Sequence, residues 1–390
     1  MLPELSAGNR VTLLCCGREY FPALLAAIES AVSEIYLETY IFADDALGRT
    51  IASGLGRAAR RGVRVHLLVD GFGARDLPDE LAAEMRADGV RLLHFRPEVT
   101  RFRLRRHRLR RLHRKLAVID GRLAFVGGIN VVDDDNVPED LAARFDYAVK
   151  VEGPVVAGIL KAMRKMWEIV TWASLRRRYR DIRPLPPACA ACGDQKAAFL
   201  VRDNIRHRQD IAQAYLAAIR LARHEIIIAN AYFLPGLRFR RALREAAARG
   251  VRVTLLLQGR SDHPLLHYAT QALYGALLHQ GVRVFEYRKG FLHAKVAVVD
   301  SIWATVGSSN IDPFSLLLAK EANLVIYDPR FAAELNDSLR QAIADGAVEL
   351  RPEDLQRMSW LSRLRRWFSY GLVRLLVGLA GYGQQHDLRN

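Results

Sequence analysis

Residues 112–130 read LHRKLAVIDGRLAFVGGIN, and residues 292–310 repeat the pattern as LHAKVAVVDSIWATVGSSN. In each stretch a lysine follows a histidine two positions later, an aspartate comes five positions after the lysine, and an asparagine closes the segment. The matching pairs are His113 and His293, Lys115 and Lys295, Asp120 and Asp300, and Asn130 and Asn310. One such segment is compatible with a strand that exposes a charged pair. Two copies at matching places in one chain predict a paired site.

The duplication extends over most of the chain. SEIYLETYIF (33–42) is similar to HEIIIANAYF (224–233), AARRGVRVHLLVDG (58–71) to AAARGVRVTLLLQG (246–259), and DGVRLLHF (88–95) to QGVRVFEY (280–287). A period of about 190 residues is too long for a solenoid and predicts two homologous half-domains. We predict a first half-domain at 1–185, a linker at 186–198, a second half-domain at 199–350 and a tail at 351–390.

Each half alternates amphipathic helices with apolar strands, and the first helices are expected at about 20–32 and 208–223. This alternation predicts an α/β fold with a mixed, largely parallel sheet in each half, covered by helices. The near-continuous apolar strands VRVHLLV and VRVTLLL fit a sheet that is covered on both faces. Asp120-Gly121 is a strong hairpin signal, and Asp300-Ser301 stands at the equivalent turn. We expect the halves to face each other across a pseudo-twofold axis, with the active site between them.

The composition indicates an anionic partner. The formal net charge is +16 and the pI is about 10.0, which suits either nucleic acid or the surface of an acidic membrane. The apolar fraction of 51% is ample for a full core. The first half carries an insertion before its histidine, RFRLRRHRLRR (101–111), and because it abuts His113 we predict that it binds anions. The alternative is a solvated basic loop.

The cysteines favour a reducing compartment, because four in 390 residues do not make a disulfide framework. Cys189 and Cys192 form a CAAC pair without a second pair at matching spacing, so we expect no metal and no cofactor. The first residues, MLPELSAGNR, lack the basic-then-apolar pattern of an export signal. The sequence contains no run of about 20 apolar residues, so we expect no membrane-spanning helix.

The histidine and lysine suggest phosphoryl chemistry. Residues two apart on a strand face the same side, so His113 is predicted to point with Lys115, and His293 with Lys295. Two lysines and two asparagines can bind the non-bridging oxygens of one phosphodiester. One histidine can then attack in line and form a phosphohistidine, while the other protonates the leaving oxygen and deprotonates the incoming alcohol. The lysines would stabilise charge where other enzymes use a metal.

The two motifs resemble the HKD motifs of the phospholipase D superfamily, H-x-K-x4-D followed by G-G or G-S and then N. ETYIF, DYAVKVEGP, YFLPG, WATVGSSNIDPFSL and EANLVI more specifically resemble bacterial cardiolipin synthases of the type without N-terminal spanning helices. The resemblance covers nearly the whole chain. It implies a catalytic set of His113, Lys115, Asp120, His293, Lys295 and Asp300. It implies supporting or phosphate-binding positions at Asn130, Asn310, Asp146, Glu321, Gly128 and Ser308.

Within that family an acid in each half orients a histidine, and Asp146 and Glu321 fall at matching positions for this role. The resemblance also implies that His113 is the nucleophile, although the residues alone do not separate the roles of the two histidines. Asp120 and Asp300 belong to the motif, but their position at the hairpin turns favours a structural role, in the turn or in an ion pair.

The resemblance implies phosphatidyl transfer between two phosphatidylglycerol molecules, which gives cardiolipin and glycerol. It places the enzyme peripherally on the cytoplasmic side of the inner membrane, with anionic phospholipid as its partner and no nucleic acid. One alternative is a phospholipase D or other phosphatidyltransferase that uses water or another alcohol. A second is a nuclease of the superfamily, which the basic charge would suit and which the single-chain duplication and the tail oppose. A non-enzymatic lipid- or DNA-binding protein is opposed by the two intact motifs.

The tail contains MSWLSRLRRWFSYGLVRLLVGLAGYG (358–383). Its leucines and Phe368 recur at helical spacing, with Arg363, Arg366 and Arg374 on another face. Its apolar part is too short for a helix to span the ~30 Å core of a bilayer. The pattern predicts a helix that lies in the headgroup layer of an anionic membrane. The alternative is a helix packed on the enzyme's own core.

Overall fold

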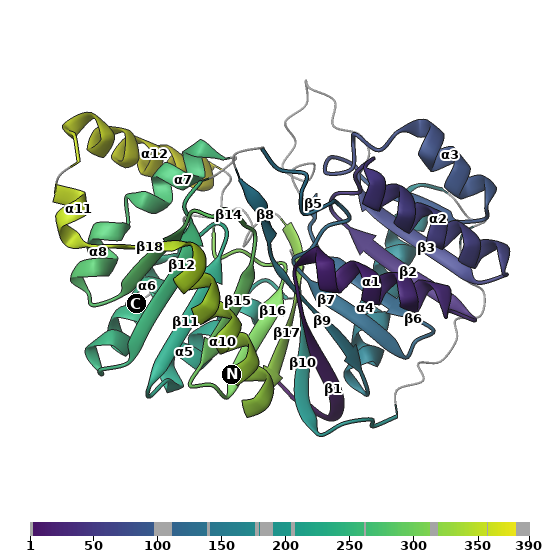
Figure 1. Cartoon of the computed structure of the whole chain (residues 1–390), viewed down its shortest axis with the longest axis horizontal. Helices are drawn as coiled ribbons and strands as arrows, with labels where there is room; N and C mark the ends of the chain where they lie inside the picture. Colours follow the sequence, from purple (N-terminus) through teal and green to yellow (C-terminus); the bar gives the residue numbers. More distant parts are fainter. Residues whose placement is uncertain are drawn as a thin grey trace.

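The computed structural model describes residues 3–96, 111–138, 141–175, 179, 190–203, 207–260, 263–312, 319–356 and 358–379. Their strands form one 16-stranded sheet and one 2-stranded sheet. Figure 1 shows the first half of the chain at the right and the second half at the left, with helices on both faces of the sheet. The two halves therefore stand side by side along one continuous sheet.

The elements have the following bounds. The strands of the first half are β1 (Ser6–Cys15), β2 (Glu34–Thr39), β3 (Arg64–Asp70), β4 (Arg91–Phe95), β5 (Arg111–Leu112), β6 (Lys115–Ile119), β7 (Leu123–Gly127), β8 (Ala142–Phe145) and β9 (Tyr147–Glu152). Those of the second half are β10 (Gln195–Arg202), β11 (Glu225–Asn230), β12 (Arg252–Gln258), β13 (Arg283–Tyr287), β14 (Gly290–Leu292), β15 (Lys295–Val299), β16 (Trp303–Gly307), β17 (Ala319–Tyr327) and β18 (Ala347–Leu350). The helices are α1 (Cys16–Glu29), α2 (Ala46–Arg60), α3 (Asp79–Ala87), α4 (Val155–Ala173), α5 (Asp210–Leu221), α6 (Leu237–Ala248), α7 (Pro264–Gln271), α8 (Tyr274–His279), α10 (Pro329–Gly346), α11 (Pro352–Gln356) and α12 (Trp360–Leu379).

The strand order confirms the predicted duplication. From the centre of the sheet the first half runs β1-β9-β7-β6-β2-β3-β4, and the second runs β10-β17-β16-β15-β11-β12-β13, with β18 added at its outer edge. β1 and β10 pair antiparallel in the middle, which is the relation that a twofold axis between them requires. Each of these seven strands of the first half thus has its counterpart at the same position in the order of the second half.

The sheet is mixed, as predicted, but its parallel part is smaller than the alternation of helices and strands indicated. Parallel pairing within each half is confined to β2-β3-β4 and to β11-β12-β13. The motif strands run as antiparallel hairpins, and these adjoin β2 and β11. The predicted hairpins are confirmed. Asp120 and Gly121, like Asp300 and Ser301, adopt positive φ angles, as a two-residue hairpin turn of this kind requires.

The core explains why the halves hold together. In the first half, Leu24 and Ile28 of α1 and Ile51 and Leu55 of α2 pack on one face of the sheet. The second half repeats this arrangement with α5 and α6. On the other side, a single apolar cluster combines β9 and α4 of the first half with β17 and α10 of the second. Since one core spans the axis, the site at the axis has a rigid support.

The proposed domain boundaries stay a prediction. β10 begins at Gln195, inside the predicted linker 186–198, and residues 186–189 of that linker lie outside the described residues. Of the basic insertion 101–111, only Arg111 is described. The predicted tail contains α11 and α12. Within the described ranges, none of the helices combines the length and apolar content that crossing a membrane requires.

Candidate active site

Each motif segment reaches across the axis before it enters its own hairpin. β5, which leads into His113, pairs with β17 of the second half, and β14, which leads into His293, pairs with β8 of the first. The N–H of His113 donates to the carbonyl oxygen of Lys320 at 3.0 Å, and that of His293 to Phe145 at 2.7 Å. Each histidine therefore lies at a crossing between halves. The sequence predicted that each histidine shares a strand with its lysine. In the structure the histidines lie just outside these strands, because β6 and β15 begin at the lysines.

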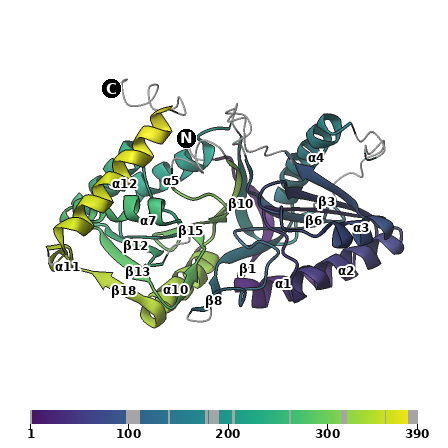
Figure 2. The same cartoon turned by 90° about the horizontal axis from the view of Figure 1, so that it is seen from above.

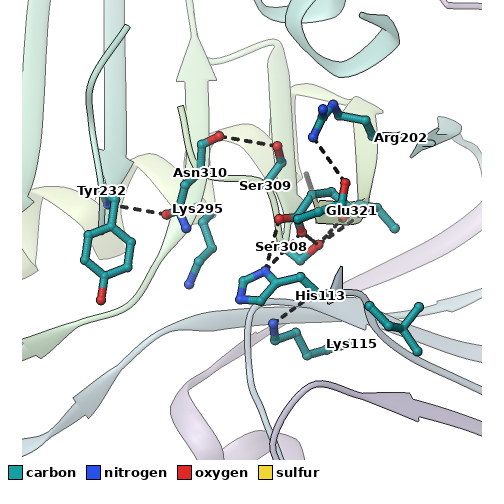
Figure 3. A network of polar contacts seen from close by, with 12 residues as sticks. His113, Lys115, Arg202, Tyr232, Lys295, Ser308, Ser309, Asn310 and Glu321 are labelled. Atoms are coloured by element: carbon teal, nitrogen blue, oxygen red, sulfur yellow. Dashed lines mark hydrogen bonds and ion pairs between the residues drawn. The ribbon is translucent and has the colours of Figure 1, made fainter. Parts of the chain in front are cut away.

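Two histidine–carboxylate pairs form across the axis. His113 Nδ1 lies 3.1 Å from Glu321 Oε2, and His293 Nδ1 lies 2.6 Å from Asp146 Oδ2. Each acid comes from the half opposite its histidine, and both are fully buried. Figure 3 shows Glu321 beside the ring of His113. Because Nδ1 of each ring donates to a carboxylate, Nε2 is the nitrogen left for chemistry. The histidine side chains are 17% and 20% exposed, so substrate can reach them.

The two lysines are buried next to the histidines. Lys115 Nζ donates to the carbonyl oxygen of His113 at 2.7 Å, and Lys295 Nζ donates to that of His293 and lies 3.6 Å from Asp146 Oδ2. Burial lowers the pKa of Lys115 to about 7 and that of Lys295 to about 8, against the opposing attraction of the two acids. A pair of buried ammonium groups at this place favours a bound anion.

The ionisation of the histidines and acids is unequal. Burial lowers the pKa of His113, and burial together with both lysines lowers that of His293 further. Burial raises the pKa of Asp146 to about 6 even though Lys295 opposes it. Glu321 is equally buried, but the nearby His113 and Lys115 and a hydrogen bond from Ser308 hold its pKa below the usual value. His113 thus has the more firmly ionised partner.

Asn130 and Asn310 make equivalent contacts in the two halves. Asn130 Oδ1 accepts from the N–H of Ile41 at 3.1 Å, and Asn310 Oδ1 from that of Tyr232 at 3.3 Å, as Figure 3 shows for the second pair. With the carbonyl end of each amide turned to the backbone, the NH₂ end is the one that can donate to a phosphate oxygen. The structure brings both asparagines to the ends of the motif hairpins.

Gly128 and Ser308 occupy equivalent positions and serve the acids differently. A Cβ at Gly128 would overlap both carboxylate oxygens of Asp146, so only glycine admits this carboxylate. At the matching place, the Ser308 hydroxyl donates to Glu321 Oε2. Each residue therefore supports the acid of its own half, which in turn binds the histidine of the other half.

Asp120 and Asp300 stand apart from the other motif residues, at the hairpin turns. Their carboxylates accept hydrogen bonds from the backbone that enters β2 and β11. The donors are the N–H groups of Val32, Ser33 and Glu34 for Asp120, and of Arg223, His224 and Glu225 for Asp300. Partial burial raises the pKa of each carboxyl, but the hydrogen bonds outweigh it and leave the pKa lowered. This position fits the structural interpretation of both aspartates, through backbone hydrogen bonds in place of an ion pair.

Sequence reasoning missed three residues that border the site. Asp70 Oδ2 accepts from the N–H of Leu112 at 2.8 Å, directly before His113, and Gln258 Oε1 does the same for Leu292 at 2.7 Å. Tyr40, the third missed residue, has its ring centroid 4.9 Å from that of His113. Asp70 and Gln258 stand at matching places in the repeats VRVHLLVDG and VRVTLLLQG, and that alignment could have found them.

Among the described residues, no group of three or more His, Cys, Asp or Glu side chains is arranged to hold a metal ion. Cys189 of the CAAC pair lies outside those residues.

Comparisons with known proteins agree with this geometry. The family described as cardiolipin synthase, PLD-like domain, matches residues 24–167 and 215–343. The chain is 40% identical to cardiolipin synthase B of Escherichia coli (strain K12), over 98% of this chain and 92% of that protein. It is 32% identical to a cardiolipin synthase of Geobacillus kaustophilus, over 89% of this chain and 67% of that protein. The crystal structure of a phosphatidylserine synthase of Haemophilus influenzae has the same fold, with a TM-score of 0.71 and 15% identity over 96% of both chains. On these matches, the chain belongs to the family of cardiolipin synthases with a phospholipase D-like domain.

Proposed function

We propose that the protein is a cardiolipin synthase that transfers the phosphatidyl group of one phosphatidylglycerol to a hydroxyl of a second, giving cardiolipin and glycerol. The observation that carries this proposal is the crossed arrangement of the histidines, each with Nδ1 on an acid of the other half and with a buried lysine beside it. Named cardiolipin synthases among the relatives support the choice of lipid.

In the first step, Nε2 of His113 attacks the phosphorus. A P–N bond forms while the P–O bond to glycerol breaks, and Nε2–H of His293 gives its proton to the leaving oxygen. Lys115, Lys295 and the two asparagine amides stabilise the negative charge on the non-bridging oxygens. Glycerol leaves, and the phosphatidyl group stays on His113.

In the second step, a hydroxyl of another phosphatidylglycerol takes the place of glycerol. Nε2 of His293 removes its proton, the new P–O bond forms, and the P–N bond to His113 breaks. Both histidines return to their starting states, and cardiolipin is the product. Water in place of the lipid hydroxyl would give phosphatidic acid, so the acceptor decides the activity.

Substrate binding helps to supply the proton that His293 must donate. Burial and the two lysines lower the pKa of His293 well below its ordinary value. A phosphodiester between the lysines brings a negative charge, which favours the protonated imidazole. Donor binding and proton uptake are therefore coupled.

The partner in this proposal is an anionic lipid surface, and α12 is the element that meets it. One face of α12 packs on α7, with Ser369 and Val373 buried. The opposite face exposes large apolar side chains, and Trp360 and Trp367 are 71% and 72% exposed. These side chains are Trp360, Leu361, Leu364, Trp367, Phe368 and Leu375. The helix thus combines both sequence hypotheses, because it packs on the enzyme and still presents an apolar face.

The place of α12 suits a peripheral enzyme. Figure 1 shows it at the same end of the sheet as β5, β8 and β14, which lead into the site, and Figure 2 shows it on the outside of the second half. Arg363 and Arg374 lie on the same helix and would attract acidic headgroups. We place the enzyme on the cytoplasmic side of the inner membrane, a choice supported by Cys15, Cys16 and Cys192, which form no disulfide.

The function is tested by incubating the purified protein with phosphatidylglycerol vesicles and identifying the products by mass spectrometry. Cardiolipin and glycerol are expected, with and without excess EDTA. Phosphatidic acid and glycerol would assign a phospholipase D. No lipid product, or activity that EDTA removes and a divalent ion restores, would contradict the proposal.

The membrane contact is tested separately by flotation with anionic liposomes. The double variant Trp367→Gln, Phe368→Gln changes only exposed side chains of α12 and is expected to stay in the soluble fraction. Trp172→Gln with Leu175→Gln is the matched control, because this pair is equally exposed at the end of α4. Equal flotation of both variants would show that α12 is not the contact.

A further inference from the structure

The strand that follows the first helix of each half ends differently in the two halves. Phe42 bridges to Val131 and Phe233 to Ile311, at equivalent places after the motif hairpins. The residues two positions earlier, Tyr40 and Ala231, are therefore equivalent as well. The first half carries a phenol ring where the second carries a methyl group.

The ring of Tyr40 lies between the backbone and the site. On one side its centroid is 4.9 Å from that of the His113 ring, and Lys115 Nζ lies 5.4 Å from the same centroid. On the other side is Gly73, where an added Cβ would overlap the Tyr40 carbonyl oxygen and come within 2.8 Å of two ring carbons. The backbone at Gly73 thus packs so closely against the Tyr40 ring that the ring cannot move away from His113 in that direction.

Asp70 fixes this backbone. Its Oδ1 accepts from the N–H groups of Phe72 and Gly73, and its Oδ2 accepts from the N–H of Leu112. One buried carboxylate therefore holds both the glycine behind the Tyr40 ring and the residue that precedes His113. Tyr40, Gly73 and Asp70 form a frame around the His113 side of the site.

The His293 side repeats the contact to the preceding residue, since Gln258 Oε1 accepts from the N–H of Leu292, but Ala231 stands in place of the tyrosine ring. In the part of the chain that the structure describes, no aromatic ring stacks on or abuts the His293 imidazole, whose polar partner is Asp146. The neighbouring Tyr232 has its ring 5.5 Å from that of His263 instead. The two reaction roles make different demands. A nucleophile must keep one position through both steps, whereas the acid–base histidine must meet a leaving glycerol and then a lipid hydroxyl.

We propose that Tyr40 is a positioning residue that holds His113 on the in-line path to phosphorus. This inference rests on the proposed function and deepens it. The ring restricts rotation of the imidazole from one face while Glu321 holds Nδ1, so Nε2 keeps one direction. Such restriction raises the rate of attack without adding a contact to the lipid.

The first test measures formation of the covalent intermediate on the full chain. Wild type and variants are mixed with labelled phosphatidylglycerol and quenched on the millisecond scale, and the label on the protein is followed over time. Tyr40→Phe keeps the ring and is expected to react within about twofold of wild type, whereas Tyr40→Ala should form the adduct at least about tenfold more slowly. Because the ring does not bind the lipid, KM should change by less than about threefold.

Gly73→Ala gives a second approach to the same ring, because it leaves Tyr40 in place but removes the room behind it. It should slow adduct formation as Tyr40→Ala does. A merely structural role would lower the melting temperature and the amount of active enzyme, but would leave the adduct rate per active site unchanged. Adduct formation at the wild-type rate in Tyr40→Ala would overturn the inference.

If wild type releases only phosphatidic acid, the proposed synthase activity fails, yet the Tyr40 test remains decisive because the adduct precedes the choice of acceptor.

Discussion

The two halves of the molecule hold their histidines with the same backbone and carboxylate contacts but surround them with different side chains. His113 has Glu321, whose pKa is held below its usual value and which accepts from Ser308, and the ring of Tyr40 lies beside it. His293 has Asp146, whose pKa burial raises to about 6, and no equivalent ring at Ala231. The symmetric scaffold thus supplies two imidazoles in unequal surroundings, and this difference is the basis of the unequal roles that we propose for them.

Removing the histidines tests this division most strongly. His113→Ala and His293→Ala are each expected to lower cardiolipin formation by at least about 10³-fold, since neither ring can act as nucleophile and acid at once. A donor with a p-nitrophenol leaving group separates them, because this group leaves without a proton. His293→Ala should still form a trapped adduct from that donor, and His113→Ala should not. Circular dichroism controls for folding, and an adduct found on His293 would reverse the roles.

Neutralising the crossed acids comes next in size. Glu321→Gln and Asp146→Asn should each reduce kcat by roughly 10²- to 10⁴-fold, because an uncharged partner no longer stabilises the imidazolium or fixes the ring. Glu321→Gln should slow adduct formation with either leaving group. Asp146→Asn should slow it with glycerol and largely spare the p-nitrophenol donor. The measurement is adduct formation in quenched-flow assays. If Glu321→Gln spared the p-nitrophenol donor and Asp146→Asn slowed it, each acid would serve the histidine of its own half.

Substitutions at Gly128 and Ser308 should lower kcat by less than the changes above, and the loss should be larger at Gly128. Gly128→Ala places a methyl group against the Asp146 carboxylate and should reduce kcat by about 10- to 100-fold, as misplacement of a catalytic group does. Ser308→Ala removes one hydrogen bond to a charged acid, worth about 1.5 kcal/mol, and should cost roughly tenfold. Steady-state kinetics with melting temperatures as a control decide the ranking. A harmless Gly128→Ala would show that Asp146 does not need its position.

The weakest expected effect is the pH dependence of KM, which follows from the two lysines. Lys115 and Lys295, with pKa values of about 7 and about 8, are charged below these values and lose their charge as pH rises through them. The KM for phosphatidylglycerol should therefore rise roughly three- to tenfold between pH 6.5 and pH 8.5. Lys115→Arg keeps its charge and should flatten this rise more than Lys295→Arg. A flat KM in wild type would mean that the lysines stay charged throughout.

Much of the fold could be predicted because the sequence contains the same pattern in both halves. The repeats aligned β2 with β11 and β3 with β12, and the hairpin signals at Asp120 and Asp300 placed the motif strands. The same comparison put Asp146, directly before β9, and Glu321, within β17, at matching positions. Local patterns of this kind depend only on residues near one another in sequence, which is why they could be predicted.

The contacts across the axis could not be predicted in this way. That Glu321 binds His113, 208 positions away, depends on β1 pairing with β10 and on β5 crossing to β17. The same crossing removes His113 from the strand on which the i, i+2 rule had placed it. Tyr40 could be aligned with Ala231, but its contact with His113 depends on the close approach of Gly73, which no sequence period reveals.

The central β1–β10 pair, which makes the two halves one sheet, has a consequence for how such a site can specialise. Two separate copies of one half could build the same crossed histidines as a homodimer, but identical subunits must present identical residues on both sides. A tyrosine placed beside one histidine would then stand beside the other. Covalent fusion lifts this constraint, so each half can change alone. A single chain can thus keep the arrangement of a symmetric dimer and still differ between the His113 side and the His293 side of the site.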